Sequence, residues 1–327
     1  ARVGLAQNLR WQGRNAAAGE VLRDAKEEQR ENPDLREQLL WVRAALGPRA
    51  RVVVVDESDS DDNAMTTTRF SGRWNPLPRV SLEGEVYYRN LEQEAIDLSR
   101  SSWGTTLSAS VQVEPGWVFE AGLGGTRTDG SGTTSFTALR GRVASPGRYP
   151  FGGVLRLRRS PLDATARLVE RGVRMDLLDV SGRWTPKSGW QLSASGGVGS
   201  FRGQETNRRV HVSGRVQRSL GGGWTLGLGH RYFGFQDDVD EFYFDPDYFG
   251  LTELLGRWTW QRGPWRLLLE AAPGAQKIRS QGELTGALRA SARLSFQLSP
   301  GREVSLSGGY SSAGVQSFST EEADYRY

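Results

Sequence analysis

The alternation of apolar and polar residues over most of the chain is the feature that most constrains its fold. In "GWQLSASGGVGSF", residues 189–201, Trp190, Leu192 and Val198 alternate with polar or small residues. Successive side chains of a β-strand point to opposite faces of a sheet, so a period of two predicts a strand. The polar face is expected to meet water. The apolar face meets either a protein core or lipid.

The same period recurs from about residue 51 to near the C-terminus, and it predicts a mainly β chain. The predicted strands, fifteen in all, are 50–57, 64–74, 79–89, 102–113, 116–128, 133–144, 152–160, 173–184, 189–201, 207–218, 223–234, 250–261, 264–272, 284–298 and 301–311. Their lengths suit tilted membrane-crossing strands of about 9–11 residues better than globular strands of about 5–6. Because closed bacterial barrels generally have an even strand number, we expect about sixteen strands, with an incomplete last one beginning near Asp324.

Short turns and long polar connections alternate along the predicted strands. The long connections are 90–101, 161–172, 235–249, 273–283 and 312–323. Short turns at one end and long loops at the other are typical of a transmembrane antiparallel β-barrel in the bacterial outer membrane.

Tryptophans indicate which solvent the apolar face meets. Eight of the 11 tryptophans lie beside the short turns, with the parity of the apolar face: Trp74, Trp117, Trp184, Trp190, Trp224, Trp258, Trp260 and Trp265. A sandwich core would place large aromatic residues near the middle of its strands. Tryptophans at the strand ends on one side are instead typical of an aromatic girdle at a membrane boundary, so we expect the apolar face to contact outer-membrane lipid.

Residues 1–49 have a helical period with a break at Asn32-Pro33, and we expect residues 50–327 to form the barrel. Large, small and turn residues of the first part follow the tetratricopeptide pattern at Leu5, Ala6, Leu9, Gly13, Ala18, Leu22 and Ala25. One such repeat cannot bury its own apolar face, so we interpret residues 1–49 as the end of a longer periplasmic array whose earlier repeats are missing here. An unrelated pair of helices is the alternative.

Composition excludes several classes of protein. No run approaches the roughly 20 apolar residues of a membrane-spanning helix. Cysteine is absent, so no disulfide or cysteine-based metal site exists. The net charge of +4 is modest, and basic residues alternate with acidic ones, so we expect no nucleic-acid partner. The two histidines, His211 and His230, have no nucleophile-elbow motif, and we expect neither an enzyme nor a cofactor.

The polar parity of the strands predicts the residues that line the barrel interior. The principal candidates are Arg79, Glu83, Glu85, Tyr87, Arg89, Arg156, Arg158, Arg215, Arg257, Arg289 and Arg293. A wall rich in arginine would favour a neutral or anionic chain over a cationic one. The alternative, which we expect for most of these residues individually, is that arginine and glutamate pairs hold neighbouring strands together.

The connection within "GFQDDVDEFYFDPDYFG", residues 234–250, is long enough to fold inward and narrow a pore. Its aromatic residues could stack on sugar rings or pack the loop onto the barrel rim. Its carboxylates lack the register of an EF-hand calcium loop, so we expect a solvated loop without a metal.

The order of helices and barrel, the first hairpin "DESDSDDN" and the segment "FYFDPDYFG" resemble the outer-membrane exporters of bacterial exopolysaccharides, the cellulose and poly-N-acetylglucosamine secretion porins. The local motif comprises Tyr243, Asp245, Pro246 and Tyr248 as pore-loop residues. The resemblance implies periplasmic tetratricopeptide repeats, a sixteen-stranded barrel and export of a linear polysaccharide. It also implies that synthase components of the periplasm or inner membrane bind the helices. The alternative is a scaffolding barrel that anchors a periplasmic repeat domain without transport.

Overall fold

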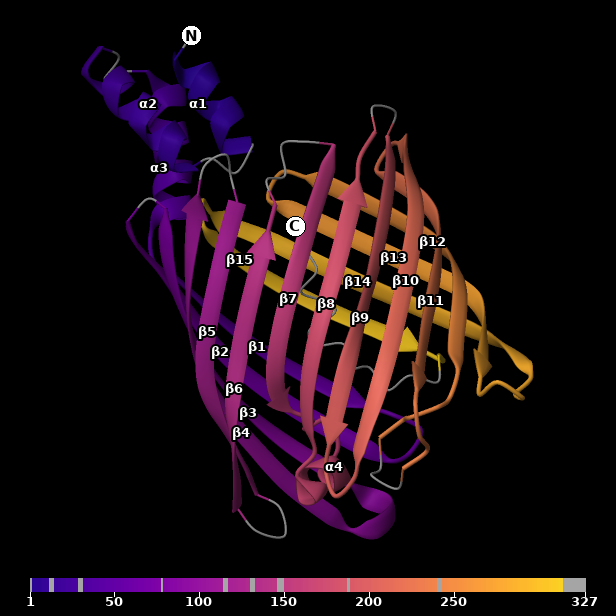
Figure 1. Cartoon of the computed structure of the whole chain (residues 1–327). Helices are drawn as coiled ribbons and strands as arrows, with labels where there is room; N and C mark the ends of the chain where they lie inside the picture. The colour runs from indigo at the N-terminus through magenta and orange to yellow at the C-terminus, as the bar shows by residue number, and fades with distance from the viewer. Residues whose placement is uncertain are drawn as a thin grey trace.

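The computed structural model describes residues 2–11, 15–28, 32–77, 79–113, 117–129, 133–145, 150–186, 189–239 and 243–313. Three helices, α1 (Arg2–Trp11), α2 (Asn15–Glu28) and α3 (Pro33–Leu46), lie at one end of a large curved sheet (Figure 1). None of the described helices is both long enough and apolar enough to cross a membrane.

The N-terminal helices have a small core of their own. Ala6, Ala18, Leu22 and Ala25 are buried together, as the sequence pattern predicts, so that α1 and α2 pack closely. Leu5, expected in this core, is exposed instead, and Gly13 lies outside the described residues. The packing is therefore that of three helices, and the tetratricopeptide assignment stays a prediction.

Helix α3 begins at the predicted Asn-Pro break. The Oδ1 atom of Asn32 accepts hydrogen bonds from the amides of Asp34, at 3.0 Å, and Leu35, at 3.4 Å. A capping asparagine followed by proline satisfies otherwise unpaired amides and sets the first helical dihedral.

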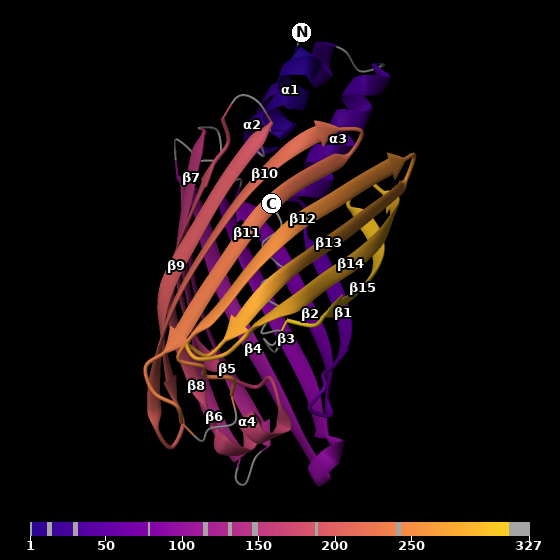
Figure 2. The same cartoon turned by 90° about the vertical axis from the view of Figure 1, so that its right-hand side faces the viewer.

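All fifteen predicted strands are present, and each pairs antiparallel with its neighbours in chain order. They are β1 (Arg49–Ser58), β2 (Asn63–Leu77), β3 (Val80–Gln93), β4 (Leu98–Val113), β5 (Trp117–Asp129), β6 (Thr133–Ala144), β7 (Phe151–Pro161), β8 (Arg174–Trp184), β9 (Trp190–Arg202), β10 (Thr206–Gly221), β11 (Trp224–Phe235), β12 (Phe249–Arg262), β13 (Trp265–Ile278), β14 (Leu284–Ser299) and β15 (Arg302–Ser311). The sheet curls around a central space (Figures 1 and 2).

Strands β1 and β15 are the two edges of the described sheet. The paired strands run from β1 to β15 without a β1–β15 pair in the part of the chain that the structure describes. The incomplete sixteenth strand predicted near Asp324 lies outside the described residues.

Two of the predicted long connections are wrong. Strands β3 and β4 extend into 90–101 and leave only a one-turn helix, η1 (Glu94–Ile96), between them. Strand β13 likewise extends to Ile278. Polar residues continue the hydrogen-bonded ladder there, because backbone pairing does not require an apolar face. Residues 162–173 and 236–248 remain long connections, as predicted, and the first holds a short helix, α4 (Ala166–Arg171).

The helices sit on the short-turn end of the sheet. Arg49 donates hydrogen bonds to the carbonyls of Ala44, at 3.2 Å, and Ala45, at 3.1 Å, in the last turn of α3. Asn75, near the end of β2, donates to the Leu46 carbonyl at 2.9 Å. We call this side the helical end and the opposite side, where α4 lies, the distal end (Figure 1).

Candidate functional site

The outer face of the sheet is apolar. Valine, leucine and aromatic side chains of the predicted apolar parity are exposed on nearly every strand, among them Val52, Leu123 and Leu254. The eight predicted tryptophans have this outward parity and lie at the helical end of their strands; seven are exposed, and Trp258 is half-buried against Trp224, with ring centroids 6.2 Å apart. The predicted aromatic belt is therefore present as a geometric feature.

Most predicted wall residues face inward and pair across strands. Glu83 binds Arg73 at 3.0 Å, and Glu85 approaches Arg69 at 3.7 Å. These pairs are the cross-strand ladders expected as the alternative to a polymer-binding wall, and they stabilise the pairing of β2 with β3.

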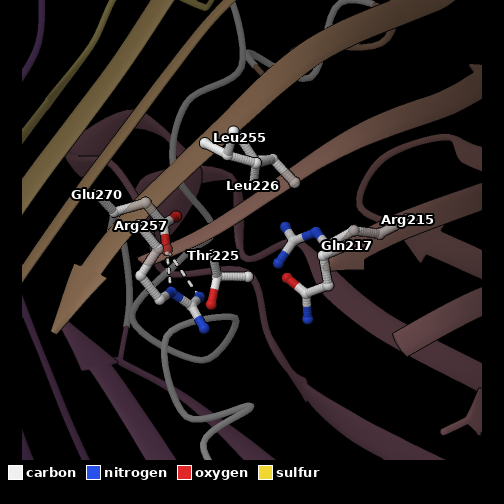
Figure 3. Close-up of a pocket in the computed structure, with 7 residues that line it drawn as sticks. All are labelled: Arg215, Gln217, Thr225, Leu226, Leu255, Arg257 and Glu270. Atoms are coloured by element: carbon white, nitrogen blue, oxygen red, sulfur yellow. Dashed lines mark hydrogen bonds and ion pairs between the residues drawn. The ribbon is translucent and has the colours of Figure 1, made fainter. Parts of the chain in front are cut away.

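A denser charged cluster covers the inner wall of β12 to β14. Arg257 reaches Glu270 at 2.7 Å, and Arg289 binds both Glu270, at 3.0 Å, and Glu253, at 3.1 Å. Arg215 and Gln217 of β10 lie across a shallow depression from the Arg257–Glu270 pair (Figure 3). Three guanidinium groups thus share two carboxylates on this part of the wall.

The wall of β6 to β8 carries a larger cationic excess. Arg142 and Arg156 are directly opposite each other, as are Arg140 and Arg158. Glu120 lies near Arg140 and Arg142, at 3.4 and 3.7 Å, and Asp179 is opposite Arg156. The four guanidinium groups of β6 and β7 therefore face two carboxylates, Glu120 and Asp179.

Two further predicted wall residues differ in outcome. Arg293 is on β14, opposite Ser307, with inward parity. Arg79 is wrongly predicted, because it lies in the exposed turn between β2 and β3 and not on the wall. The turn ends the alternation one residue before β3 begins.

The connection between β7 and β8, residues 162–173, folds into the interior at the distal end. Helix α4 packs against β3, β4 and β5, with Ala166 and Val169 buried beside Leu91 of β3. Leu162 and Leu168 are buried in a second cluster, which includes Phe201 of β9 and other inward side chains of β8, β11, β12 and β14. Helix α4 thus packs on β3, β4 and β5, and its Leu168 belongs to an apolar cluster that extends to β14.

A buried polar anchor holds this connection to the wall. The Asp163 carboxylate forms an ion pair with Arg89 and accepts hydrogen bonds from Ser102 Oγ at 2.7 Å and Tyr87 OH at 3.1 Å. Tyr87 and Arg89, predicted as pore-lining residues, thus bind this connection. No local pattern singles out Asp163, because its partners lie more than 60 residues away in the sequence.

The connection between β11 and β12 folds inward beside it, which its length allowed; the expectation of a solvated loop is wrong for Tyr243 and Asp245, which are buried. Tyr243 is buried against Phe201 and Phe235, with ring centroids 5.3 and 5.4 Å apart. The side chain of buried Asn207, on β10, forms two hydrogen bonds with the backbone of Asp237. Its Oδ1 accepts from the Asp237 amide at 3.1 Å, and its Nδ2 donates to the Asp237 carbonyl at 2.5 Å. We call residues 162–173 and the described parts of 236–248 the distal plug.

The four motif residues of this loop have different positions. Asp245 is buried and accepts from the Val239 amide at 2.8 Å, and the Pro246 carbonyl accepts from the Phe235 amide at 2.9 Å. Tyr248 contacts Tyr232, an outward residue of β11, with ring centroids 5.4 Å apart. The placement of Tyr248 in the pore is therefore wrong, because the chain crosses the rim between Pro246 and β12.

Two carboxylates of the loop respond oppositely to their surroundings. Burial raises the pKa of Asp245, although the Val239 amide opposes the shift. Hydrogen bonds from Ser280 lower the pKa of Asp247, which lies at the exposed surface of the loop. Among the described residues, no three histidine or carboxylate side chains gather to hold a metal.

The two histidines lie on opposite faces of the sheet. His211 faces inward and its Nε2 lies 2.9 Å from Asp179, whereas His230 faces outward beside the Thr252 hydroxyl at 2.9 Å.

Neither a scan against protein-family models nor a search of curated proteins finds a match. Among solved structures, one described as "Bacterial polysaccharide outer membrane secretin" aligns with a TM-score of 0.64 at 12% identity, over 81% of this chain and 91% of that one. The FrpB iron transporter of Neisseria meningitidis aligns at 0.46 and 8% identity, over 76% of this chain and 55% of that one. The copper transporter OprC gives 0.42 and 13%, over 76% and 50%. This chain thus shares the β-barrel fold of the secretin structure.

Proposed function

We propose that this chain is an outer-membrane β-barrel that exports a linear exopolysaccharide from the periplasm to the cell surface. The single observation that carries the proposal is the division of the sheet into an apolar, tryptophan-bounded outer face and a charged inner wall. An apolar outer face is stable in hydrocarbon, whereas the inner wall needs water or a polar cargo. The fold shared with a polysaccharide secretin supports this assignment.

The charge of the wall favours a neutral or anionic polymer. The arginines of β6 and β7 outnumber the carboxylates that face them, and those of β10, β12 and β14 do so by one. Like-signed walls with low-dielectric surroundings concentrate ligands of opposite charge. In this proposal the helices lie in the periplasm, as the end of a repeat array that recruits synthase components.

The distal plug gives the exporter a closed state. Apolar clusters join the plug to β3 on one side and to β8, β9, β11, β12 and β14 on the other, so in this proposal cargo passes only after the plug leaves the barrel mouth. The plug also favours a second candidate function, a scaffolding barrel that anchors the helices in the membrane and never opens.

Planar-bilayer conductance separates the two functions. In one variant, residues 164–171 and 238–247 are replaced by glycine-serine linkers of equal length. As an exporter, this variant should conduct more than the native chain, and linear neutral or anionic polysaccharide added at the helical end should block the current. A matched control replaces only the distal hairpin tip, residues 203–205, which is exposed and outside the plug. A plug-free variant that folds but conducts no more than the control would favour the scaffold.

A further inference from the structure

The outward side chains of β7 to β10 change from apolar to charged at one level near the distal end. On the side of this level that faces the helical end, the outward positions include the exposed residues Leu157, Leu178, Val198 and Val210. The next row, in register across the strands, consists of Arg159, Asp176, Ser200 and Arg208. The row beyond it consists of Pro161, Arg174, Arg202 and Thr206.

These two rows concentrate positive charge. Arg159 binds Asp176 at 2.5 Å, and Arg174 and Arg202 approach the same carboxylate at 3.9 Å each. The side chains of Arg174 and Arg202 are 32% and 51% exposed, so their guanidinium groups are accessible to a ligand. The Asp176 side chain is only 19% exposed, because the surrounding arginines cover its carboxylate. With Arg208 of the same row and Glu205 of the nearby hairpin tip, the patch holds four arginines against two carboxylates.

The pairing of Arg174 with Arg202 is unfavourable by itself. They are directly opposite each other on β8 and β9. Like charges at opposed positions of a sheet destabilise it, and one shared carboxylate compensates only part of the repulsion. A bound anion would compensate the rest, and guanidinium groups bind phosphate oxygens through paired hydrogen bonds.

The patch lies at the level expected of lipid headgroups. Asp176 and Trp184 of the aromatic belt are eight residue steps apart on β8. At about 3.3 Å per residue and a tilt of about 40°, this distance is about 20 Å of membrane depth, close to the roughly 25 Å apolar band of such barrels. Acyl chains of the same lipid would cover the exposed apolar residues that adjoin the patch on its helical-end side.

We propose that Arg159, Arg174, Arg202 and Arg208 bind the phosphate of an anionic glycolipid headgroup in the outer leaflet. The inference rests on the outer-membrane part of the proposed function, but it is independent of transport. The occupant is a lipid and not free phosphate, because the arginines border an apolar outer surface and face away from the interior.

Lipid A titrations of the purified chain in neutral detergent test the site. Diphosphoryl lipid A should raise the unfolding temperature of the native chain, and R174Q/R202Q should weaken its apparent affinity at least tenfold. The matched control is R218Q, because Arg218 is an outward residue of β10 at the helical end, 5.3 Å from the Trp190 ring; its affinity should stay native. D176N removes the competing carboxylate and should tighten binding, which keeps the test available if the double variant fails to fold.

Dephosphorylated lipid A with the same acyl chains should bind native and variant chains equally. Equal affinity of R174Q/R202Q and the native chain for the diphosphoryl form would overturn the proposal, as would equal stabilisation by inorganic phosphate alone. A chain that binds lipid A but never conducts would count against export and leave this site intact.

Discussion

Removal of the Asp163 carboxylate should release the distal plug. The side chains of Arg89 and Asp163 are 13% and 7% exposed, so the Asp163→Ala change leaves an uncompensated buried charge. Breaking a buried ion pair on one side costs about 3–5 kcal/mol. At the lower figure, and with 1.4 kcal/mol per tenfold, the ratio of open to closed plug should rise about 100-fold.

Open probability in planar bilayers measures this change, with Glu170→Gln as the matched control. Glu170 lies on the same plug helix and binds Arg100 at 3.2 Å, but the two side chains are 38% and 25% exposed. Exposed pairs contribute about 0–1 kcal/mol, so this control should shift the ratio by no more than about fivefold. Asp163→Asn keeps an acceptor for Ser102 and Tyr87 and should be intermediate. Equal open probabilities for Asp163→Ala and Glu170→Gln would refute the role of the ion pair as the anchor.

Three further predictions concern the loop and the belt. Asn207→Ala should cost the docked loop about 1–3 kcal/mol, seen as faster protease cleavage within 236–248, because its amide holds both backbone groups of one residue. The fluorescence of a single tryptophan is the difference between the native chain and its Trp→Phe variant. Brominated lipid should quench the Trp224 signal, obtained with Trp224→Phe, but not the Trp11 signal, obtained with Trp11→Phe, since only Trp224 belongs to the belt. Because burial raises the pKa of Asp245, the docked loop binds its proton more tightly than the free loop. Hydrogen-exchange protection of Val239 should thus be greatest below about pH 4 and fall as pH rises through the raised pKa, and Asp245→Asn should remove this dependence.

The strands could be predicted because a period of two is local information. Each predicted strand appears within a few residues of its expected bounds, except where polar ends extend the ladder, as in β3 to Gln93. The ladders also follow from local information, since a tight turn fixes the register of its hairpin. The two-residue turn after Arg262 makes Arg257 oppose Glu270.

The plug could not be predicted in the same way. Helix α4 has recognisable end signals, because Thr165 caps its start and Gly172, with φ of 67°, follows its end. These signals give a short helix but not its place. That place depends on contacts of Asp163 with β3 and β4, and on inward aromatic residues of β9, β11 and β12 that local alternation marks only as departures from a polar wall. Tyr243 and Tyr248 are five residues apart in one motif yet lie inside and outside the barrel, because the chain crosses the rim between them.

The chemistry of the plug bears on whether it opens. A permanent seal would be most stable with apolar contacts alone, since a buried ion pair gives little net stability against well-packed hydrophobic residues. Here apolar packing of Leu168 and Tyr243 is combined with charged and amide anchors at Asp163 and Asn207. Polar anchors can exchange their partners for water when the plug leaves, which lowers the cost of opening relative to an all-apolar seal. The composition of the plug therefore favours a reversible closure, and hence the exporter, over a barrel that only anchors the helices.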